Sequence, residues 1–265
     1  MKDNISSSSG RRSAILQTLK QNFNISVSEL SARFGVSEVT IRKDLNLLKE
    51  RNLLVRTRGG AILHESRKED NDTSIRFKKL ANYREKKAIG RAAANLIEEG
   101  DTILIDSGTT ALQVACNLHR FKNLTIITNA LNVAQEVLNY KRFNLILLGG
   151  NIRNASESVV GVLAESNLKM FYCDKLFMGV DSFSVENGLS TPNIEEAHIN
   201  QVMISRSREV IAVFDSSKVN KRALAFITHL NKINTVVTDD GMDKSIRTQL
   251  KNLNVSVVAV RPDQD

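Results

Sequence analysis

Short apolar runs rich in β-branched residues alternate with helical patterns along most of this chain. Amphipathic segments, for example residues 86–98 and 109–118, separate the runs. Strands that are apolar on both faces and joined by helices are typical of a parallel sheet covered on both sides. We therefore predict an α/β domain with a mostly parallel sheet over residues 85–265. The predicted strands are residues 102–105, 124–127, 143–148, 175–180, 210–214, 235–237 and 255–260.

The first sixty residues carry a different pattern. Ser26 and Glu29 have the spacing of a capping box, and Gly35 suits the left-handed residue that ends a helix. A helix, a tight turn, a second helix and a basic turn together predict a winged helix-turn-helix over residues 1–61. The predicted elements are helices at 11–22, between Ser26 and Gly35, and at 37–50, a strand at 53–55 and a basic turn at 56–60.

The third predicted helix has two different faces. Ile41, Leu45 and Leu48 lie at i, i+4 and i+7 and are expected to point into a small core. The N-terminal end of this helix should enter the major groove of DNA. That end and the opposite face carry groups able to contact base edges or phosphates, namely Ser37, Val39, Thr40, Arg42, Lys43 and Asn46. Arg56 and Arg58 of the basic turn are predicted to contact the DNA backbone or minor groove.

The distribution of charge agrees with this interpretation. Residues 1–60 hold eleven Lys and Arg and five Asp and Glu, whereas residues 61–265 hold 26 basic and 24 acidic residues. A basic domain joined to a nearly neutral one favours nucleic acid as the partner of the basic domain. Two alternatives remain at this point, a solvated basic surface and a three-helix module that docks on protein.

Residues 62–84 include a polar run of mixed charge with no apolar period, which predicts a solvated linker. No stretch approaches the length of a membrane span, and the N-terminus lacks the apolar core of a signal peptide. Cys116 and Cys173 lie in apolar segments without metal-ligand spacing. We expect a cytoplasmic protein that uses no metal or other cofactor and does not bind a membrane.

Polar groups follow the predicted strands where each one ends. The residues Asp106-Ser107-Gly108-Thr109-Thr110 follow the first strand and open a helix. Glycine lets an anion approach the backbone, and the helix N-terminus and hydroxyls supply donors. Further candidates after later strands are Thr128, Asn129, Gly149, Gly150, Asp181 and Lys218. Each of these motifs is also compatible with a helix cap, a turn or a surface residue, but their recurrence at the carboxyl ends of strands favours a phosphosugar site.

Both halves of the chain resemble the DeoR family of bacterial repressors. In the N-terminal half the resemblance rests on residues 27–30, 34–45 and 58–61, with Arg58 where the family pattern has histidine. In the C-terminal half it rests on residues 85–90, 106–110, 128–129, 149–150, 179–181, 188–191 and 216–218. Residues 176–181 and 192–197 are most similar to the branch of the family that represses N-acetylgalactosamine utilisation.

The resemblance implies a DNA-binding repressor of a carbohydrate-utilisation operon whose sensor domain is related to ribose-5-phosphate isomerase and sugar-phosphate deaminases. Residues 107–110 would hold the phosphate of a phosphorylated sugar or amino-sugar effector, assisted by Lys86 and Lys218. Asp181 and Glu196 would face the sugar. The family also implies double-stranded operator DNA as a partner and a homodimer or homotetramer, because two half-sites match a two-fold protein.

The main alternative is a sugar-phosphate isomerase or deaminase with a DNA-binding appendage, for which Glu196 or Asp181 would supply the base. After Asp181, however, residues 182–188 lack the glycine-rich lysine loop that the related isomerases place there. The sequence therefore predicts a binding pocket without catalysis.

Overall fold

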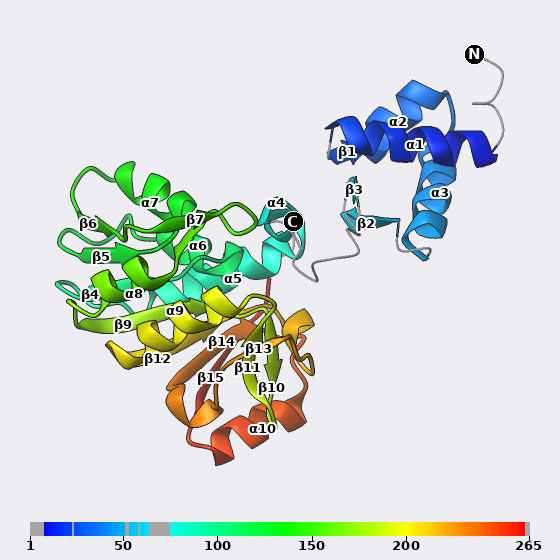
Figure 1. The fold of residues 1–265 in the computed structure, drawn as a ribbon. Coiled ribbons are helices and arrows are strands. Elements are labelled where there is room, and N and C mark those ends of the chain that lie inside the picture. Colours follow the sequence, from blue (N-terminus) through cyan, green and yellow to red (C-terminus); the bar gives the residue numbers. More distant parts are fainter. Residues whose placement is uncertain (1–7, 23, 51–52, 58, 64–74, 263–265) are drawn as a thin grey trace. The chain divides into compact units, whose positions relative to one another are not determined.

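The computed structural model of the protein describes residues 8–22, 24–50, 53–57, 59–63 and 75–262. The chain divides into two compact units, Met1–Thr73 and Ser74–Asp265, which are drawn in Figure 1 and described separately below. Among the described residues, no helix is long and apolar enough to cross a membrane. The same residues contain no cluster of three or more His, Cys, Asp or Glu suited to a metal ion.

The smaller unit has the winged helix-turn-helix arrangement that the sequence predicts. Its sheet is antiparallel, in the order β1-β3-β2, and β2 and β3 form the wing. The elements are α1 (Ser8–Asn22), β1 (Asn24–Ser26), α2 (Val27–Phe34), α3 (Glu38–Glu50), β2 (Leu54–Thr57) and β3 (Gly60–Leu63).

Local sequence explains how these elements end and pack. The Ser26 hydroxyl accepts from Glu29 N at 3.1 Å, and Ser26 N donates to Glu29 Oε2 at 2.8 Å, which completes the predicted capping box. Gly35 ends α2 with a φ of 62°, a conformation that costs glycine least. Ile15 of α1 and Ile41 of α3 are fully buried in the core that joins the helices.

The larger unit is built on a parallel sheet of seven strands among the described residues, in the order β15-β14-β12-β9-β4-β5-β6. Every neighbouring pair in it is parallel. The predicted mostly parallel α/β fold is therefore confirmed. The strands are β4 (Thr102–Ile105), β5 (Thr125–Thr128), β6 (Asn144–Leu147), β9 (Cys173–Gly179), β12 (Ser207–Val213), β14 (Thr235–Asp239) and β15 (Ser256–Val260).

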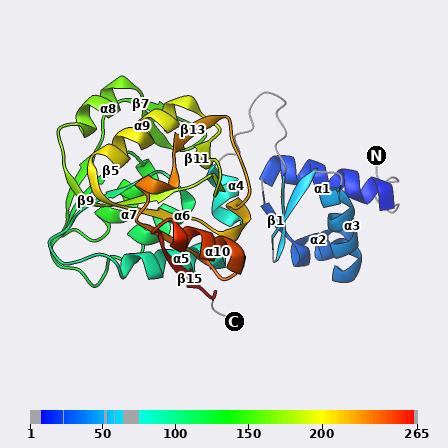
Figure 2. The ribbon, with the colours of Figure 1, turned by 90° about the horizontal axis from the view of Figure 1, so that it is seen from below.

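Helices and a second small sheet cover the two faces of this sheet. Figure 2 shows α8 and α9 on one side and α5 and α6 on the other. The helices are α4 (Ile75–Leu80), α5 (Tyr83–Ala94), α6 (Thr109–Ala115), α7 (Leu131–Leu138), α8 (Val162–Leu168), α9 (Ile194–Ser205), α10 (Lys244–Asn252) and the short 3₁₀ turns η1 (Ser216–Lys218) and η2 (Leu230–Lys232). The remaining strands are β10 (Ser182–Ser184), β11 (Gly188–Thr191) and β13 (Ala225–Thr228), which form the small sheet, and the hairpin β7 (Asn151–Arg153) and β8 (Ser158–Val160).

Successive apolar side chains of each central strand point to opposite faces of the sheet and pack into the core on each side. In β4, Ile103 and Ile105 pack with α5, α6 and α7, whereas Leu104 packs with α8 and α9. In β9, Phe177 likewise packs with α5, α6 and α7, and the next residue, Met178, packs with α8 and α9 on the other face of the sheet. A strand buried on both faces reads as an uninterrupted apolar run, which explains why the sequence pattern located these strands well.

The strand order reverses between β4 and β9. From β4 the chain moves outward through β5 to β6, then returns to the other side of β4 and continues through β9, β12, β14 and β15. In open parallel sheets, ligands bind outside the carboxyl ends of the strands at such a switch point. The topology therefore directs attention to the residues that follow β4 and β9.

The structure differs from the predicted linker, residues 62–84, at both of its ends. Strand β3 runs to Leu63, and α4 and the start of α5 occupy residues 75–84. Ile75 is buried, and its N–H donates to the carbonyl of Ala155 at 2.8 Å, so α4 packs on the larger unit. A helix of six residues is too short to show a helical period in the sequence.

Candidate functional site

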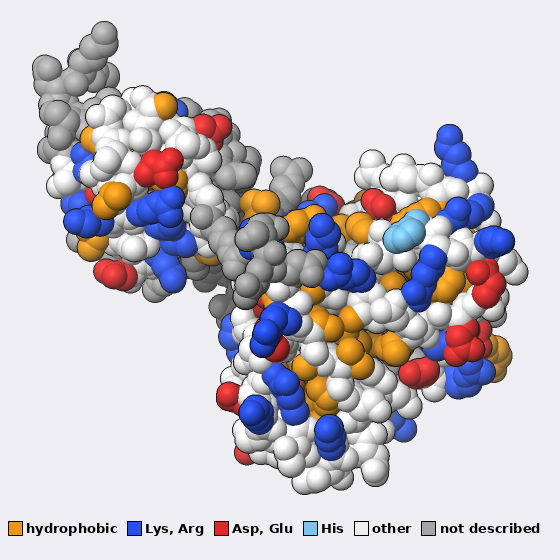
Figure 3. Space-filling view, turned by 180° about the vertical axis from the view of Figure 1, so that it is seen from behind, with side chains coloured by type: hydrophobic (Ala, Val, Ile, Leu, Met, Phe, Trp, Pro, Cys, Tyr) orange, Lys and Arg blue, Asp and Glu red, His pale blue; other side chains and the backbone are white. Residues whose placement is uncertain are grey.

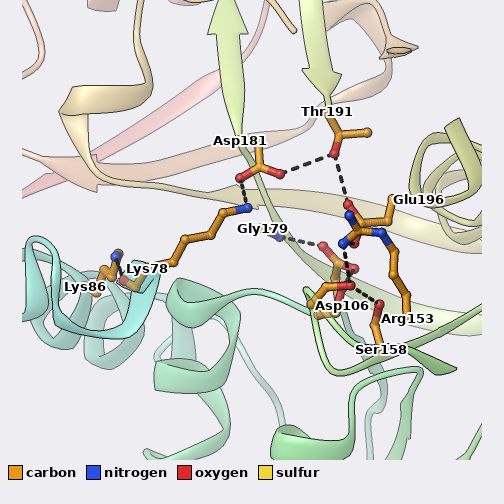
Figure 4. Close-up of polar contacts among 11 residues, drawn as sticks. Lys78, Lys86, Asp106, Arg153, Ser158, Gly179, Asp181, Thr191 and Glu196 are labelled. Atoms are coloured by element: carbon orange, nitrogen blue, oxygen red, sulfur yellow. Dashed lines mark hydrogen bonds and ion pairs between the residues drawn. The ribbon is translucent and has the colours of Figure 1, made fainter. Parts of the chain in front are cut away.

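A pocket opens at the switch point, and residues from α4, α5, α6, β11, α9 and η1 also line it. Figure 4 shows several of these residues, among them Lys78, Thr191 and Glu196. The predicted site residues that line it are Lys86, Asp106, Ser107, Gly108, Thr109, Thr110, Asp181, Glu196 and Lys218. The other lining residues, to which the sequence analysis assigned no role in the site, are Ile75, Lys78, Ala155, Ser156, Gly179, Val180, Thr191, Asn200 and Ile227.

The turn after β4 forms one wall of the pocket. Gly108 has extended backbone, with a φ of −158°, and α6 begins at the next residue. A Cβ atom on Gly108 would lie 3.4 Å from the Cα of Gly179, so the ends of β4 and β9 approach closely here. Thr109 and Thr110 are buried at the start of α6. The backbone N–H groups and hydroxyls of this turn are suited to an anion.

Lysine side chains reach the pocket from α4, α5 and η1. The Lys86 ammonium donates to the carbonyl of Lys78 and, at 2.5 Å, to that of Ala81. Burial lowers the pKa of Lys86 to about 8, although the nearby charge of Asp215 opposes the shift. Burial likewise lowers the pKa of Lys218. Desolvated cations of this kind gain stability when an anion binds beside them.

Two carboxylates on the opposite wall share one hydroxyl donor. Thr191 Oγ1 lies 3.2 Å from Asp181 Oδ2 and 3.2 Å from Glu196 Oε2 (Figure 4). Lys78 Nζ pairs with Asp181 Oδ1 at 2.7 Å, and Arg153 Nη1 pairs with Glu196 Oε1 at 3.3 Å. Because a hydroxyl has a single proton, Thr191 donates to one carboxylate at a time. The other carboxylate keeps acceptor capacity for hydroxyls of a ligand.

The charges around Asp181 determine its ionisation. Burial by itself would raise the pKa of this carboxyl, but Lys78 and Lys218 outweigh burial, and the pKa is lowered below its ordinary value. Asp181 is therefore ionised near neutral pH and can only accept hydrogen bonds.

Asp106 behaves in the opposite way. It is buried at the end of β4, where Oδ2 accepts from Gly179 N at 3.1 Å. Burial raises the pKa of Asp106 to about 7, and the charges of Glu196 and Asp181 add to the rise, while backbone hydrogen bonds from Ser107 and Gly179 oppose it. Near neutral pH, this carboxyl is divided between a form that donates a hydrogen bond and a form that only accepts.

Four predicted site residues do not line the pocket. Thr128 Oγ1 donates to Ile105 O at 2.7 Å, and Asn129 Nδ2 donates to Val159 O at 3.1 Å, so both residues tie β5 to its neighbours. Gly149 and Gly150 follow β6, the outermost strand on that side. These positions end strands as predicted, but β5 and β6 lie one and two strands away from the switch point.

Lys78, Thr191 and Arg153 had no predicted role, although the first two line the pocket and Arg153 pairs with the lining residue Glu196. Thr191 stood in a motif quoted for the family resemblance, but without a role. Lys78 fell in the predicted linker, and Arg153 lies in a strand of three residues. The only sequence signal for Arg153 is its position four residues after Gly149.

Asp239 fixes the position of the loop that carries Lys218. Asp239, at the end of β14, accepts from Ser216 N at 2.6 Å and from Ser216 Oγ at 2.7 Å. Asp215 Oδ1 accepts from Asn82 Nδ2 at 2.8 Å, which joins this loop to the start of α5. These hydrogen bonds connect η1, which carries Lys218, both to the end of β14 and to the start of α5, which carries Lys86.

In the smaller unit, α3 presents the predicted polar face to solvent. Val39 is 63% exposed, and Arg42 and Lys43 are also exposed. Figure 3 shows Lys and Arg side chains gathered on the face of this unit that is in view. Ile41, Leu45 and Leu48 point into the core as predicted. The exposed face has the composition of a helix that reads the major groove.

Other residues predicted to contact DNA are engaged within the unit. Ser37 Oγ lies 3.3 Å from Thr40 N and 3.0 Å from Thr40 Oγ1 at the start of α3. Arg56 Nη1 donates to Asn46 Oδ1 at 2.9 Å and to Arg42 O at 3.1 Å, so this side chain fastens the wing to α3. Arg58 lies outside the described residues.

Two family models match the chain in sequence. The model of the DeoR-like helix-turn-helix domain matches residues 11–67, and the model of the DeoR C terminal sensor domain matches residues 81–240. The solved structure of ribose 5-phosphate isomerase A from Methanocaldococcus jannaschii is similar over 54% of this chain and 56% of its own, with 16% identity and a TM-score of 0.40.

Curated relatives are similar over nearly their whole length. A protein of Escherichia coli O157:H7 named "Putative aga operon transcriptional repressor" is 35% identical, over 97% of this chain and 95% of the relative. The glycerol-3-phosphate regulon repressor of Escherichia coli K12 is 34% identical, over 86% of this chain and 90% of the relative. These names describe regulators and decide against the isomerase or deaminase alternative. The chain belongs to the DeoR family of transcriptional regulators.

Proposed function

We propose that this protein represses a carbohydrate-utilisation operon and that a phosphorylated sugar controls its affinity for the operator. The observation that carries the proposal is the pocket at the switch point of the sheet, which Lys78, Lys86 and Lys218 line together with the turn 107–110. The names of the relatives support it, because they include repressors of the aga operon and of a glycerol-3-phosphate regulon.

The phosphate would bind at the turn after β4. Backbone N–H groups and the hydroxyls of Ser107, Thr109 and Thr110 would donate to its oxygens, and Lys86 and Lys218 would supply positive charge. The sugar hydroxyls would face Asp181 and Glu196, whose carboxylates accept hydrogen bonds. An amino-sugar phosphate also fits, because its ammonium group donates to the same acceptors.

Control of DNA binding follows from linkage. If the effector binds one arrangement of the protein more tightly than another, operator affinity changes by the same factor. The exposed face of α3 would read one operator half-site, and a second copy would read the other, since half-sites about 34–36 Å apart match a two-fold protein. A homodimer or homotetramer is therefore part of the proposal.

Arg42→Ala is expected to weaken operator binding about 5- to 150-fold, because a contact of this kind to a base is worth about 1–3 kcal/mol. The measurement is fluorescence anisotropy of labelled DNA that the wild-type chain selects from a random pool. Lys49→Ala is the matched control, since Lys49 is exposed in the last turn of the same helix. An equal loss in both variants would contradict the assignment of the reading face.

Lys218→Met is expected to weaken binding of the sugar phosphate about 10- to 150-fold, because hydrogen bonds to charged groups are worth about 1.5–3 kcal/mol. Isothermal titration calorimetry with a panel of sugar phosphates measures the change. Lys221→Met, an exposed position three residues away, should bind normally. If Lys218→Met bound every sugar phosphate as the wild type does, the phosphate would lie elsewhere.

A further inference from the structure

Arg56, on strand β2 of the wing, holds Asn46 of α3 in a defined orientation. Arg56 Nη1 donates to Asn46 Oδ1 at 2.9 Å and to the carbonyl of Arg42 at 3.1 Å. Arg56 Nε is buried, and it has no hydrogen-bond partner among the residues that the structure describes. The sequence predicts that Arg56 contacts the DNA backbone or minor groove, whereas in the structure its guanidinium is directed toward α3.

The chemistry of arginine decides which end of the Asn46 amide faces it. The oxygen of a side-chain amide accepts hydrogen bonds, the nitrogen donates them, and a guanidinium can only donate. The end that lies 2.9 Å from Arg56 Nη1 is therefore the oxygen, Oδ1. The nitrogen, Nδ2, is left for another partner. Within the described part of the chain Nδ2 donates to no residue, and the Asn46 side chain is exposed.

An amide fixed in this way distinguishes the bases in the major groove. Asparagine pairs with adenine through both ends at once, because the oxygen accepts from the N6 amino group while the nitrogen donates to N7. In Asn46, Oδ1 already accepts from a cation, and the positive charge of that cation disfavours an amino group beside it. Guanine presents two acceptors at the same edge, N7 and O6. It therefore offers partners to Nδ2 and no donor that meets Arg56.

We propose that Arg56 makes Asn46 a hydrogen-bond donor toward the major groove, so that Asn46 selects guanine rather than adenine in each operator half-site. Asn46 touches the base in this arrangement, and Arg56 is a positioning residue that acts through it. The inference rests on the proposed function, in which the exposed face of α3 reads the operator. It adds the base that one residue of this face prefers and the wing residue that sets the preference.

The first measurement identifies the base that Asn46 reads. Anisotropy gives the Kd of the full chain, without sugar phosphate, for the selected operator and for versions with each of the four base pairs at every half-site position. Asn46→Ala should remove the base preference at one position of each half-site. At that position the wild type should bind guanine about 2- to 10-fold more tightly than adenine, the effect of one net hydrogen bond.

Lys49→Ala, at an exposed position in the last turn of the same helix, is the control and should leave every base preference unchanged. A preference for adenine at the position that Asn46→Ala affects would overturn the proposal. So would an Asn46→Ala chain that keeps the wild-type preference at every position. Neither result depends on whether a variant of Arg56 folds.

The second measurement tests the role of Arg56. Arg56→Met removes the donors and frees Asn46 Oδ1, so the amide can pair with adenine through both ends. At the Asn46 position, the ratio of the adenine Kd to the guanine Kd should fall at least about 5-fold, because a bidentate pair discriminates by that factor or more. Arg56→Lys should retain the preference for guanine, since lysine also can only donate. A merely structural role of Arg56 would weaken binding to all four bases equally, and that result would overturn the proposal.

The salt dependence of binding separates this role from a contact of Arg56 with phosphate. Loss of one phosphate contact reduces the slope of log K against log salt concentration by about 0.9, whereas Arg56→Met should leave the slope unchanged. A slope reduced by that amount would overturn the proposal. A wild type that selects no operator would overturn both this inference and the proposed function. A selected operator with adenine at the Asn46 position would overturn this inference alone.

Discussion

Replacing Asp44 with alanine is expected to unfold most of the DNA-binding unit while the larger unit stays intact. Asp44 is buried on α3, where Oδ2 accepts from Arg11 Nε at 2.6 Å and Oδ1 lies 3.3 Å from Arg12 Nη1. Removing one partner of a buried ion pair costs about 3–5 kcal/mol, because the remaining charge is buried without compensation. A unit of this size has only about 3–10 kcal/mol of stability, so the change removes much of it.

Circular dichroism and binding measurements together distinguish this outcome from misfolding of the whole chain. Far-ultraviolet circular dichroism should show a partial loss of helix, whereas the near-ultraviolet circular dichroism of the three tyrosines, all of which lie in the larger unit, should remain unchanged. Operator binding should be lost, and binding of the sugar phosphate should persist. Glu38→Ala is the matched control, because its pair with Arg42 is exposed and such pairs on a helix contribute about 0.3–0.5 kcal/mol. Full operator binding by Asp44→Ala would show that the buried pair is not needed for the fold.

Asp106→Asn is expected to change how the stability of the larger unit depends on pH. The pKa of Asp106 rises from 3.8 to about 7 on folding, so between these values the folded state binds the proton more tightly than the unfolded state does. The free energy of unfolding therefore decreases as pH rises from about 4, because the folded state must give up a proton that it binds more tightly. Above about pH 7 this loss of stability has reached its full size. At about 1.4 kcal/mol per pKa unit, the full cost is about 4 kcal/mol.

Asparagine does not ionise, so the variant should lack this dependence and keep the acceptor for Gly179 N. Urea unfolding, followed by the tyrosine signal, measures the free energy of unfolding at pH 5 and pH 8. The stability of Asp106→Asn relative to the wild type should rise by about 2–3 kcal/mol between those two pH values. An unchanged difference would mean that Asp106 is ionised over the whole range.

Much of the fold could be predicted from the sequence because its signals are local. The capping box at Ser26 and Glu29, the glycine that ends α2 and the apolar face of α3 all lie within a few residues of one another. The strands of the large sheet are apolar on both faces, and such runs are visible without knowing their neighbours. Elements of three to six residues, such as β7 and α4, contain too few residues to establish a period.

The pocket could be predicted only in part because its composition depends on strand order. Sequence shows that Asp106, Thr128 and Gly149 each follow a strand, but not that β4 lies beside β9 while β5 and β6 lie farther out. The return of the chain to β9 brings Asp181 to the turn after β4. The same non-local packing brings Lys78 into the pocket from a segment whose composition resembles a linker.

The central claim is that one phosphorylated sugar controls the binding of DNA. The most direct test is anisotropy of the selected operator, titrated with the full chain at one salt concentration, with and without each sugar phosphate. We expect at least one sugar phosphate to shift the operator Kd by about 5- to 150-fold, in either direction. The unphosphorylated sugar and inorganic phosphate should not do so, and Lys218→Met should lose the response. Tight operator binding that no sugar phosphate alters, or that the unphosphorylated sugar alters equally, would contradict the account.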